Sequence, residues 1–175
     1  MSSTITLTPT VKHKIDYAII SAMPEELDFF KTKFSNLNFT EVNIGELTFK
    51  VYDYQNAKVL IAHSGIGTAF AAGVFTLIYS FFQPDYFLVS GTAGGIKEGM
   101  QLRDVVVAEK AFEAEMQDVF IQVKNTPFES CLKHPIKNEC FPMNYAADPE
   151  LLNIFNSLNL SNINRNYSPH FPQLN

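Results

Sequence analysis

The stretch YFLVSGTAGG, residues 86–95, decides the fold expected of this chain. Its first half is a short apolar run, which predicts a buried strand, and Gly91-Thr92-Ala93-Gly94-Gly95 after it predicts a tight turn. Glycine tolerates backbone angles closed to other residues and leaves no side chain between the chain and a ligand. A glycine turn at the carboxyl end of a buried strand therefore predicts one wall of a small-molecule pocket.

Two earlier parts of the chain repeat the order strand, turn, helix. Residues 15–21 predict a strand, and Pro24 suits the first turn of a helix whose large apolar residues are Leu27, Phe29, Phe30 and Phe34. Residues 58–63 predict a second strand, which Ser64-Gly65-Ile66-Gly67 separates from an aliphatic helix over 68–82 that should be buried.

Further strands are predicted over residues 47–54, which form a hairpin with 58–63, and over 104–108. These elements indicate an α/β fold, with a mixed central sheet covered by helices on both faces. Right-handed crossovers should bring the turns at 21–26, 64–67 and 91–95 to one rim of that sheet.

Length and composition predict one packed domain. The chain has 175 residues, is 46% hydrophobic and has a mean hydropathy near zero. We expect a flexible leader over 1–13, the domain over 14–160 and an Asn-rich tail over 161–175. Residues 124–149 contain four prolines and predict a long loop, after which Asp148 and Pro149 start a helix.

Charge and motif content exclude several function classes. The formal net charge is −5 and the basic residues are scattered, so nucleic acid is not an expected partner. No apolar stretch is long enough for a membrane span, which predicts a cytoplasmic protein without a membrane partner. Cys131, His134 and Cys140 match no zinc pattern, and GxGxxG is missing from the first strand-to-helix turn, so we expect neither metal nor cofactor.

Acidic residues at the start of the first helix allow two interpretations. Glu25 and Glu26 would complement the helix dipole and could close a capping box. Alternatively, one carboxylate faces the pocket and orients a water as general base. Ser64-Gly65-Ile66-Gly67 is equally open, since it is either a plain helix start capped by Ser64 or a second wall of the pocket.

Taken together, the three turns resemble the nucleoside phosphorylase superfamily, and most closely its 5'-methylthioadenosine/S-adenosylhomocysteine nucleosidases. The resemblance covers roughly residues 15–119 and is carried by Ala22-Met23-x-Glu25-Glu26, Ser64-Gly65-Ile66-Gly67 and Gly91-Thr92-Ala93-Gly94-Gly95, with support from Gly99 to Val107. It implies a nucleoside phosphorylase-like fold and hydrolysis of the N-glycosidic bond between adenine and a 5'-thio-substituted ribose, through a ribosyl cation-like transition state. Such a reaction belongs to purine and methionine salvage.

The resemblance also implies roles for individual residues. Glu26 would be the catalytic acid that holds the attacking water, and Thr92 would lie beside the sugar. Met23 and Ile66 would approach the ribose and its 5'-substituent, and the backbone of Ala93 and Gly94 would face the base. The implied partner is a second copy of the chain, with an apolar lid formed across the homodimer interface by Val119 and Phe120.

Two departures bear on activity. Phosphorylases of this superfamily place an arginine just before the glycine turn, where this chain has Leu88-Val89-Ser90, which favours water over phosphate as the nucleophile. The family's Met-Glu pair for the ribose hydroxyls and its Asp for the leaving base have no counterpart here. We therefore expect a domain that is incomplete at its C-terminal end, and inactivity is one expected consequence. The alternatives are a non-catalytic nucleoside-binding or subunit-pairing protein and, less favoured, a purine nucleoside phosphorylase.

Overall fold

The computed structural model describes residues 13–45, 47–102, 104–111 and 145–158. The expectations for the leader, for Val119 and Phe120, for Cys131, His134 and Cys140, and for the Asn-rich tail lie outside the described residues. The chain divides into two compact units, Met1–Gly94 and Gly95–Asn175, which are described separately below. The predicted domain over 14–160 stays a prediction.

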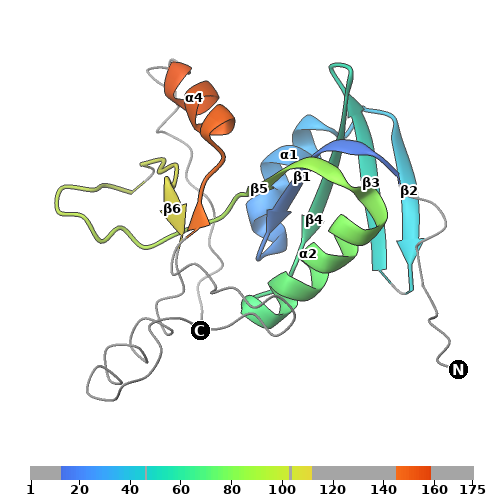
Figure 1. Cartoon of the computed structure of the whole chain (residues 1–175), viewed down its shortest axis with the longest axis horizontal. Helices are drawn as coiled ribbons and strands as arrows, with labels where there is room; N and C mark the ends of the chain where they lie inside the picture. Colours follow the sequence, from blue (N-terminus) through green and yellow to red (C-terminus); the bar gives the residue numbers. More distant parts are fainter. Residues whose placement is uncertain (1–12, 46, 103, 112–144, 159–175) are drawn as a thin grey trace, which may run out of the picture. The chain divides into compact units, whose positions relative to one another are not determined.

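The first unit is built on a five-stranded mixed sheet with the order β2-β3-β4-β1-β5 (Figure 1). The interior strand β1 pairs in parallel with β4 and β5, whereas β2, β3 and β4 pair antiparallel through two hairpins. The strand bounds are Ile15–Ser21 for β1, Phe39–Ile44 for β2, Leu47–Tyr54 for β3, Ala57–His63 for β4 and Pro84–Val89 for β5. This arrangement confirms the expected mixed sheet.

Helices cover both faces of this sheet. Successive strand residues point to opposite faces, and Ile20 accordingly packs with Ile78 and Phe82 of α2 (Thr68–Phe82). Ile19 packs on the other face with Leu27 from the 3₁₀ helix η1 (Pro24–Leu27) and with Phe34, the residue after α1 (Asp28–Lys33). Two apolar clusters therefore hold β1 between helical layers.

Residues with positive φ make the short connections. Gln55 and Asn56 have φ values of 47° and 66° and join β3 to β4, as expected of a two-residue hairpin turn. Strand β2 was not expected, and its connection to β3 includes Gly45 at φ 59°. The missed signal is a β-prone run, FTEVNI, that a glycine separates from a second such run.

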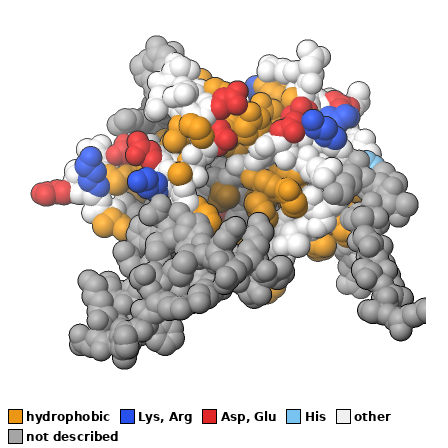
Figure 2. All heavy atoms as spheres, in the orientation of Figure 1, with side chains coloured by type: hydrophobic (Ala, Val, Ile, Leu, Met, Phe, Trp, Pro, Cys, Tyr) orange, Lys and Arg blue, Asp and Glu red, His pale blue; other side chains and the backbone are white. Residues whose placement is uncertain are grey.

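Helix α2 differs from the buried helix expected from its composition. Of its residues only Ile78 and Phe82 are buried, while Phe70 is 66% exposed and Phe75 and Tyr79 are exposed as well. A helix that is apolar all round needs cover on more than one side, and here the sheet covers one side only. Hydrophobic side chains at the surface are visible in Figure 2. Phe29 of α1 is also exposed.

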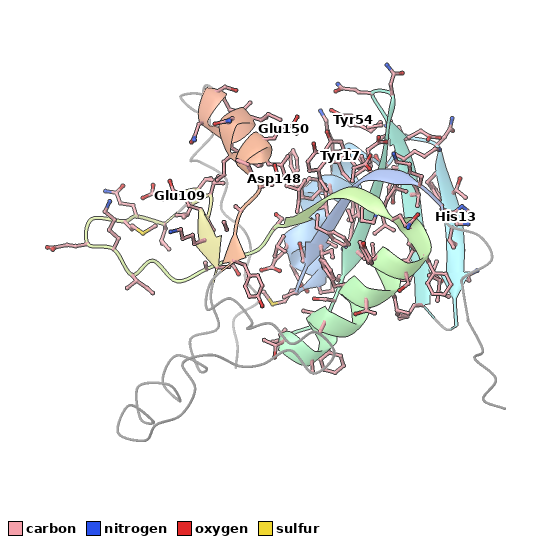
Figure 3. All side chains as sticks on the ribbon, in the orientation of Figure 1. His13, Tyr17, Tyr54, Glu109, Asp148 and Glu150 are labelled. Carbon is pink, nitrogen blue, oxygen red and sulfur yellow. The ribbon has the colours of Figure 1, made fainter. Side chains whose placement is uncertain are left out.

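The described residues of the second unit contain less regular structure. A two-residue ladder joins β6 (Lys110–Ala111) to β7 (Tyr145–Ala146), and helix α4 spans Pro149–Ser157. The Asp148 carboxylate caps α4 by accepting hydrogen bonds from the N–H groups of Glu150 and Leu151, which confirms the predicted start (Figure 3).

The strand predicted over 104–108 was wrong. These residues form no ladder, and the side chains of Val105, Val106 and Val107 are exposed. β-Branched residues favour a strand only when neighbouring strands pack against them, so the apolar run alone was not sufficient. None of the helices in the described parts of the chain is long and apolar enough to cross a membrane.

Candidate active site around Glu26

The carboxyl ends of β4, β1 and β5 lie at one rim of the first unit's sheet, as their parallel pairing requires. Beyond the last ladder pairs, the Ser64 N–H donates to the carbonyl of Ser21 at 2.8 Å. On the other side, the Ser90 N–H donates to the carbonyl of Ile20 at 2.9 Å. The turns at 21–26, 64–67 and 91–94 therefore start side by side, as the strand order predicted.

The Glu26 carboxylate joins two of these turns. Its Oε1 accepts hydrogen bonds from the Thr92 N–H at 2.7 Å and from the Thr92 hydroxyl at 3.0 Å. Its Oε2 accepts from the N–H groups of Ala22 at 3.1 Å and Met23 at 3.0 Å. The bond from Met23 is the backbone half of a capping box, so Glu26 caps its own helix and contacts the glycine turn at the same time.

These donors stabilise the ionised form of Glu26. Partial burial raises the pKa of the carboxyl group, but the hydrogen bonds from Thr92, Met23 and Ala22 favour the ionised form and together outweigh it. The pKa of Glu26 is therefore lowered from its ordinary value of 4.5. At neutral pH the side chain is a fixed anion.

Gly91 allows the carboxylate to come this close to the turn. A Cβ atom at this position would lie 3.1 Å from Oε1 of Glu26 and 3.4 Å from its Cδ, closer than most real Cβ contacts. A Cβ at Gly94, by contrast, would have no neighbour within 4 Å. The sequence indicated a need for glycine in this turn, and the structure shows that Gly91 is the position that Glu26 crowds.

The other predicted site residues within the described part of the chain lie in the same three turns. Met23 is half-buried and reaches Glu26 through its backbone, whereas Ala93 and Gly94 are exposed in the glycine turn. Ile66 is 73% exposed, so its side chain is open to a ligand. The suggestion that Ser64 caps α2 was wrong, because the N-cap is Gly67, whose φ of 110° suits glycine.

Sequence reasoning missed Ser21, the last residue of β1. Its side chain is buried, and its hydroxyl donates a hydrogen bond to the carbonyl of Ser90. A serine that interrupts an otherwise apolar strand end was the available signal, because a buried hydroxyl needs a partner.

A cavity of about 370 Å³ lies elsewhere in the first unit. It is bordered by residues of η1, α1, β3, β4 and α2, among them Lys31, Lys50 and His63, but by neither Glu26 nor Thr92. We place the candidate site at Glu26 nevertheless, because hydrogen bonds from two separate turns converge on that one carboxylate.

Comparison with known proteins places the chain in a family. The family model of the phosphorylase superfamily matches residues 16–169. The 5'-methylthioadenosine/S-adenosylhomocysteine nucleosidase of Bacillus pumilus is 35% identical over 91 residues, which are 52% of this chain and 38% of that protein. The Bacillus subtilis protein of the same name is 30% identical over 137 residues, which are 78% of this chain and 54% of that protein.

A solved structure shows the same likeness in three dimensions. The nucleosidase of Streptococcus pneumoniae, determined with the transition-state inhibitor MT-ImmA, superposes with a TM-score of 0.62 at 27% identity, covering 87% of this chain and 60% of that one. The chain thus spans less than two thirds of the length of each of these relatives. The match over residues 16–169 includes all three turns and the strands before them, and on this basis the chain belongs to the phosphorylase superfamily.

Proposed function

We propose that this chain hydrolyses the N-glycosidic bond of adenine nucleosides with a 5'-thio-substituted ribose, with Glu26 as the catalytic carboxylate. The observation that carries the proposal is the pair of contacts from Thr92 to Glu26, 66 residues away in sequence. The relatives described above support the substrate class, since they are named for 5'-methylthioadenosine and S-adenosylhomocysteine. Met23, Ile66, Ala93 and Gly94 would surround the nucleoside.

In this mechanism Glu26 positions water before it accepts a proton. A carboxylate offers about four lone-pair sites, and the four donors present occupy a corresponding number. Three of these donors are backbone N–H groups, so the Thr92 hydroxyl is the donor that can rotate away. A water molecule would take its place on Oε1, and the freed hydroxyl would bind the sugar.

The low pKa of Glu26 suits a reaction in which bond breaking runs ahead of attack. An anion with a lowered pKa is a weak base and removes a proton from neutral water poorly. The opening glycosidic bond leaves its electron pair on adenine, which takes up a proton from solvent. The ribose is then cation-like, so the attacking water becomes acidic and a weak base is sufficient. The negative charge of Glu26 would also stabilise that developing cation.

Water is favoured over phosphate because the three turns contain no cation. Neither lysine nor arginine occurs in the turns at 21–26, 64–67 and 91–95, and the first of these turns contains two glutamates. A phosphate anion would meet the Glu26 carboxylate without a compensating positive charge in these turns. The phosphorylase alternative is therefore the weaker one.

We also propose a homodimer, with Val119 and Phe120 of each chain near the partner's site. The exposed aromatic residues of α2, Phe70, Phe75 and Tyr79, support this, because exposed apolar patches commonly mark protein interfaces. Sedimentation equilibrium would show twice the chain mass if the proposal holds, and a single chain mass would reject it.

Incubation of the purified chain with methylthioadenosine, followed by chromatography of released adenine, tests the activity. Glu26→Gln keeps the shape of the side chain and removes its charge, and we expect it to lower the rate by about 10²- to 10⁴-fold. Glu25→Gln is the matched control, since Glu25 is the exposed neighbour in the same turn. Wild-type protein that releases no adenine would reject hydrolysis.

Nucleoside binding without turnover is the second candidate. It is retained because the chain matches less than two thirds of the length of its relatives. Calorimetry with methylthioadenosine separates the two. Binding without adenine release would identify a binding protein, and an absence of both would reject both functions.

A further inference from the structure

Ser21 has an unusual place in the described part of the chain. It is the single buried polar or charged residue there, 1% exposed, on strand β1 between β4 and β5 of the first unit's sheet. The Ser21 carbonyl accepts a hydrogen bond from the Ser64 N–H, and its hydroxyl donates to the Ser90 carbonyl. One residue thus connects the ends of both flanking strands.

The hydroxyl occupies a position that a regular ladder would give to a backbone group. In a parallel ladder, a bridging residue makes two hydrogen bonds to the neighbouring strand. Its N–H donates to the carbonyl of residue i of that strand, and its own carbonyl accepts from the N–H of residue i+2. Ser90 donates to Ile20, so the regular donor to the Ser90 carbonyl would be Ala22. The Ala22 N–H instead donates to Oε2 of Glu26 at 3.1 Å.

We propose that Ser21 is a positioning residue for the Glu26 site, because its hydroxyl replaces the Ala22 N–H on the Ser90 carbonyl. The replacement has two effects. It leaves the Ala22 N–H available to the carboxylate, and it keeps the end of β5 against β1, two residues before Thr92. Its importance for catalysis rests on the proposed function, whereas its effect on Glu26 does not.

Removing the hydroxyl should disturb Glu26 through both effects. In Ser21→Ala the Ser90 carbonyl loses its side-chain donor in a buried environment, which is unfavourable. The Ala22 N–H is then drawn back to that carbonyl and away from Glu26. The turn after β5 is also less firmly held, so the two bonds from Thr92 to Oε1 weaken.

The test is an NMR titration of the full chain with ¹³C-labelled glutamate carboxyl groups, in which Glu26→Gln assigns the signal. We expect the pKa of Glu26 to rise toward 4.5 in Ser21→Ala. Ser21→Cys keeps nearly the same volume with a weaker donor, so its pKa should lie between those of Ser21→Ala and wild type. An unchanged Glu26 pKa in both variants would overturn the proposal.

Two controls separate positioning from general loosening of the fold. Thr76→Ala removes another hydroxyl that donates to a carbonyl, that of Ala72 within α2. Ile78→Val weakens the buried core between α2 and the sheet. Both should leave the Glu26 pKa at the wild-type value, and an equal rise in Ile78→Val would show that Ser21 acts through stability alone.

Activity supplies the readout that depends on the proposed function. A displaced carboxylate should lower kcat about 10- to 100-fold in Ser21→Ala, with a smaller change in KM because the walls of the site remain. If the wild-type chain releases no adenine, the proposed hydrolysis fails and the titration alone decides the role of Ser21. If the pKa rises but kcat does not change, Ser21 positions Glu26 without importance for the reaction, and the catalytic part of the proposal is rejected.

Discussion

The two units of this chain differ in the sequence range of the contacts inside each of them. In residues 13–94, hydrogen bonds connect Glu26 with Thr92 and Ser21 with Ser90 across more than 60 positions, and two apolar clusters fill both faces of the sheet. In the described part of the second unit, Gln101 donates to Asp104, and Asp148 caps the helix that starts beside it. A two-residue ladder supplies longer-range pairing there.

This difference shows what a motif needs in order to become a site. The glycine turn at 91–94 has a defined partner because β1, η1 and β5 place the Glu26 carboxylate against it. Residues 99–107 also resemble the family, but Val105, Val106 and Val107 remain exposed. In this chain, a family-like sequence therefore forms a defined site only where neighbouring elements pack on it.

Truncating one apolar side chain in each unit should give the largest contrast. Phe82 is fully buried and packs against the Phe49 ring at 5.4 Å, so Phe82→Ala should lower the free energy of unfolding by about 3–5 kcal/mol. Val106 is exposed, and Val106→Ala should change it by less than about 0.5 kcal/mol. Urea unfolding followed by far-UV circular dichroism measures both. Similar losses for the two variants would mean that the second unit has a core of its own around Val106.

The sequence predicted the parts of the fold in which local and long-range preferences agree. Parallel strands with short turns were recognisable from apolar runs that end in Ser21, His63 and Ser90, and the meeting of these turns followed from parallel pairing. The position of the acids in a first helical turn left Glu25 and Glu26 both open as candidates, and only the family resemblance pointed to Glu26.

The remainder depended on information that is not local. Whether α2 is covered on its second side depends on what packs there, and its apolar composition is the same in either case. The exchange of donors among Ser21, Ala22 and Ser90 depends on the register between β1 and β5, which no single segment specifies. The strand predicted over 104–108 was wrong because its valines depend in the same way on neighbouring strands, which the local sequence does not specify.

The comparison can be sharpened within the glycine turn itself. Gly91→Ala places a Cβ 3.1 Å from Oε1 of Glu26 and should displace the carboxylate, at a cost of about 1–3 kcal/mol in stability. The displacement should also raise the pKa of Glu26, because the bonds from Thr92 lengthen. Gly94→Ala is the matched control, since its Cβ would enter open space. If the two alanine variants have the same stability and the same Glu26 pKa, the close approach at Gly91 has no importance.

The smallest expected effect is the pH dependence that Glu26 gives to the first unit. Its pKa is lowered on folding, so the unfolded chain binds the proton more tightly, and acid shifts the equilibrium toward unfolding. The stabilising contribution of the Glu26 anion should be constant above about pH 5.5 and should decrease as the pH falls through 4.5 and below. Urea midpoints of wild type and Glu26→Gln, measured from pH 7 to pH 3, should therefore converge on the acid side, because the glutamine variant lacks this proton-binding site. Glu25→Gln, which removes a negative charge from the exposed neighbour in the same turn, is the control. If the urea midpoints of wild type and Glu26→Gln differ by the same amount over the whole pH range, the bonds from Thr92, Met23 and Ala22 do not favour the anion. The Glu26 contact would then be no stronger than the local contacts of the second unit.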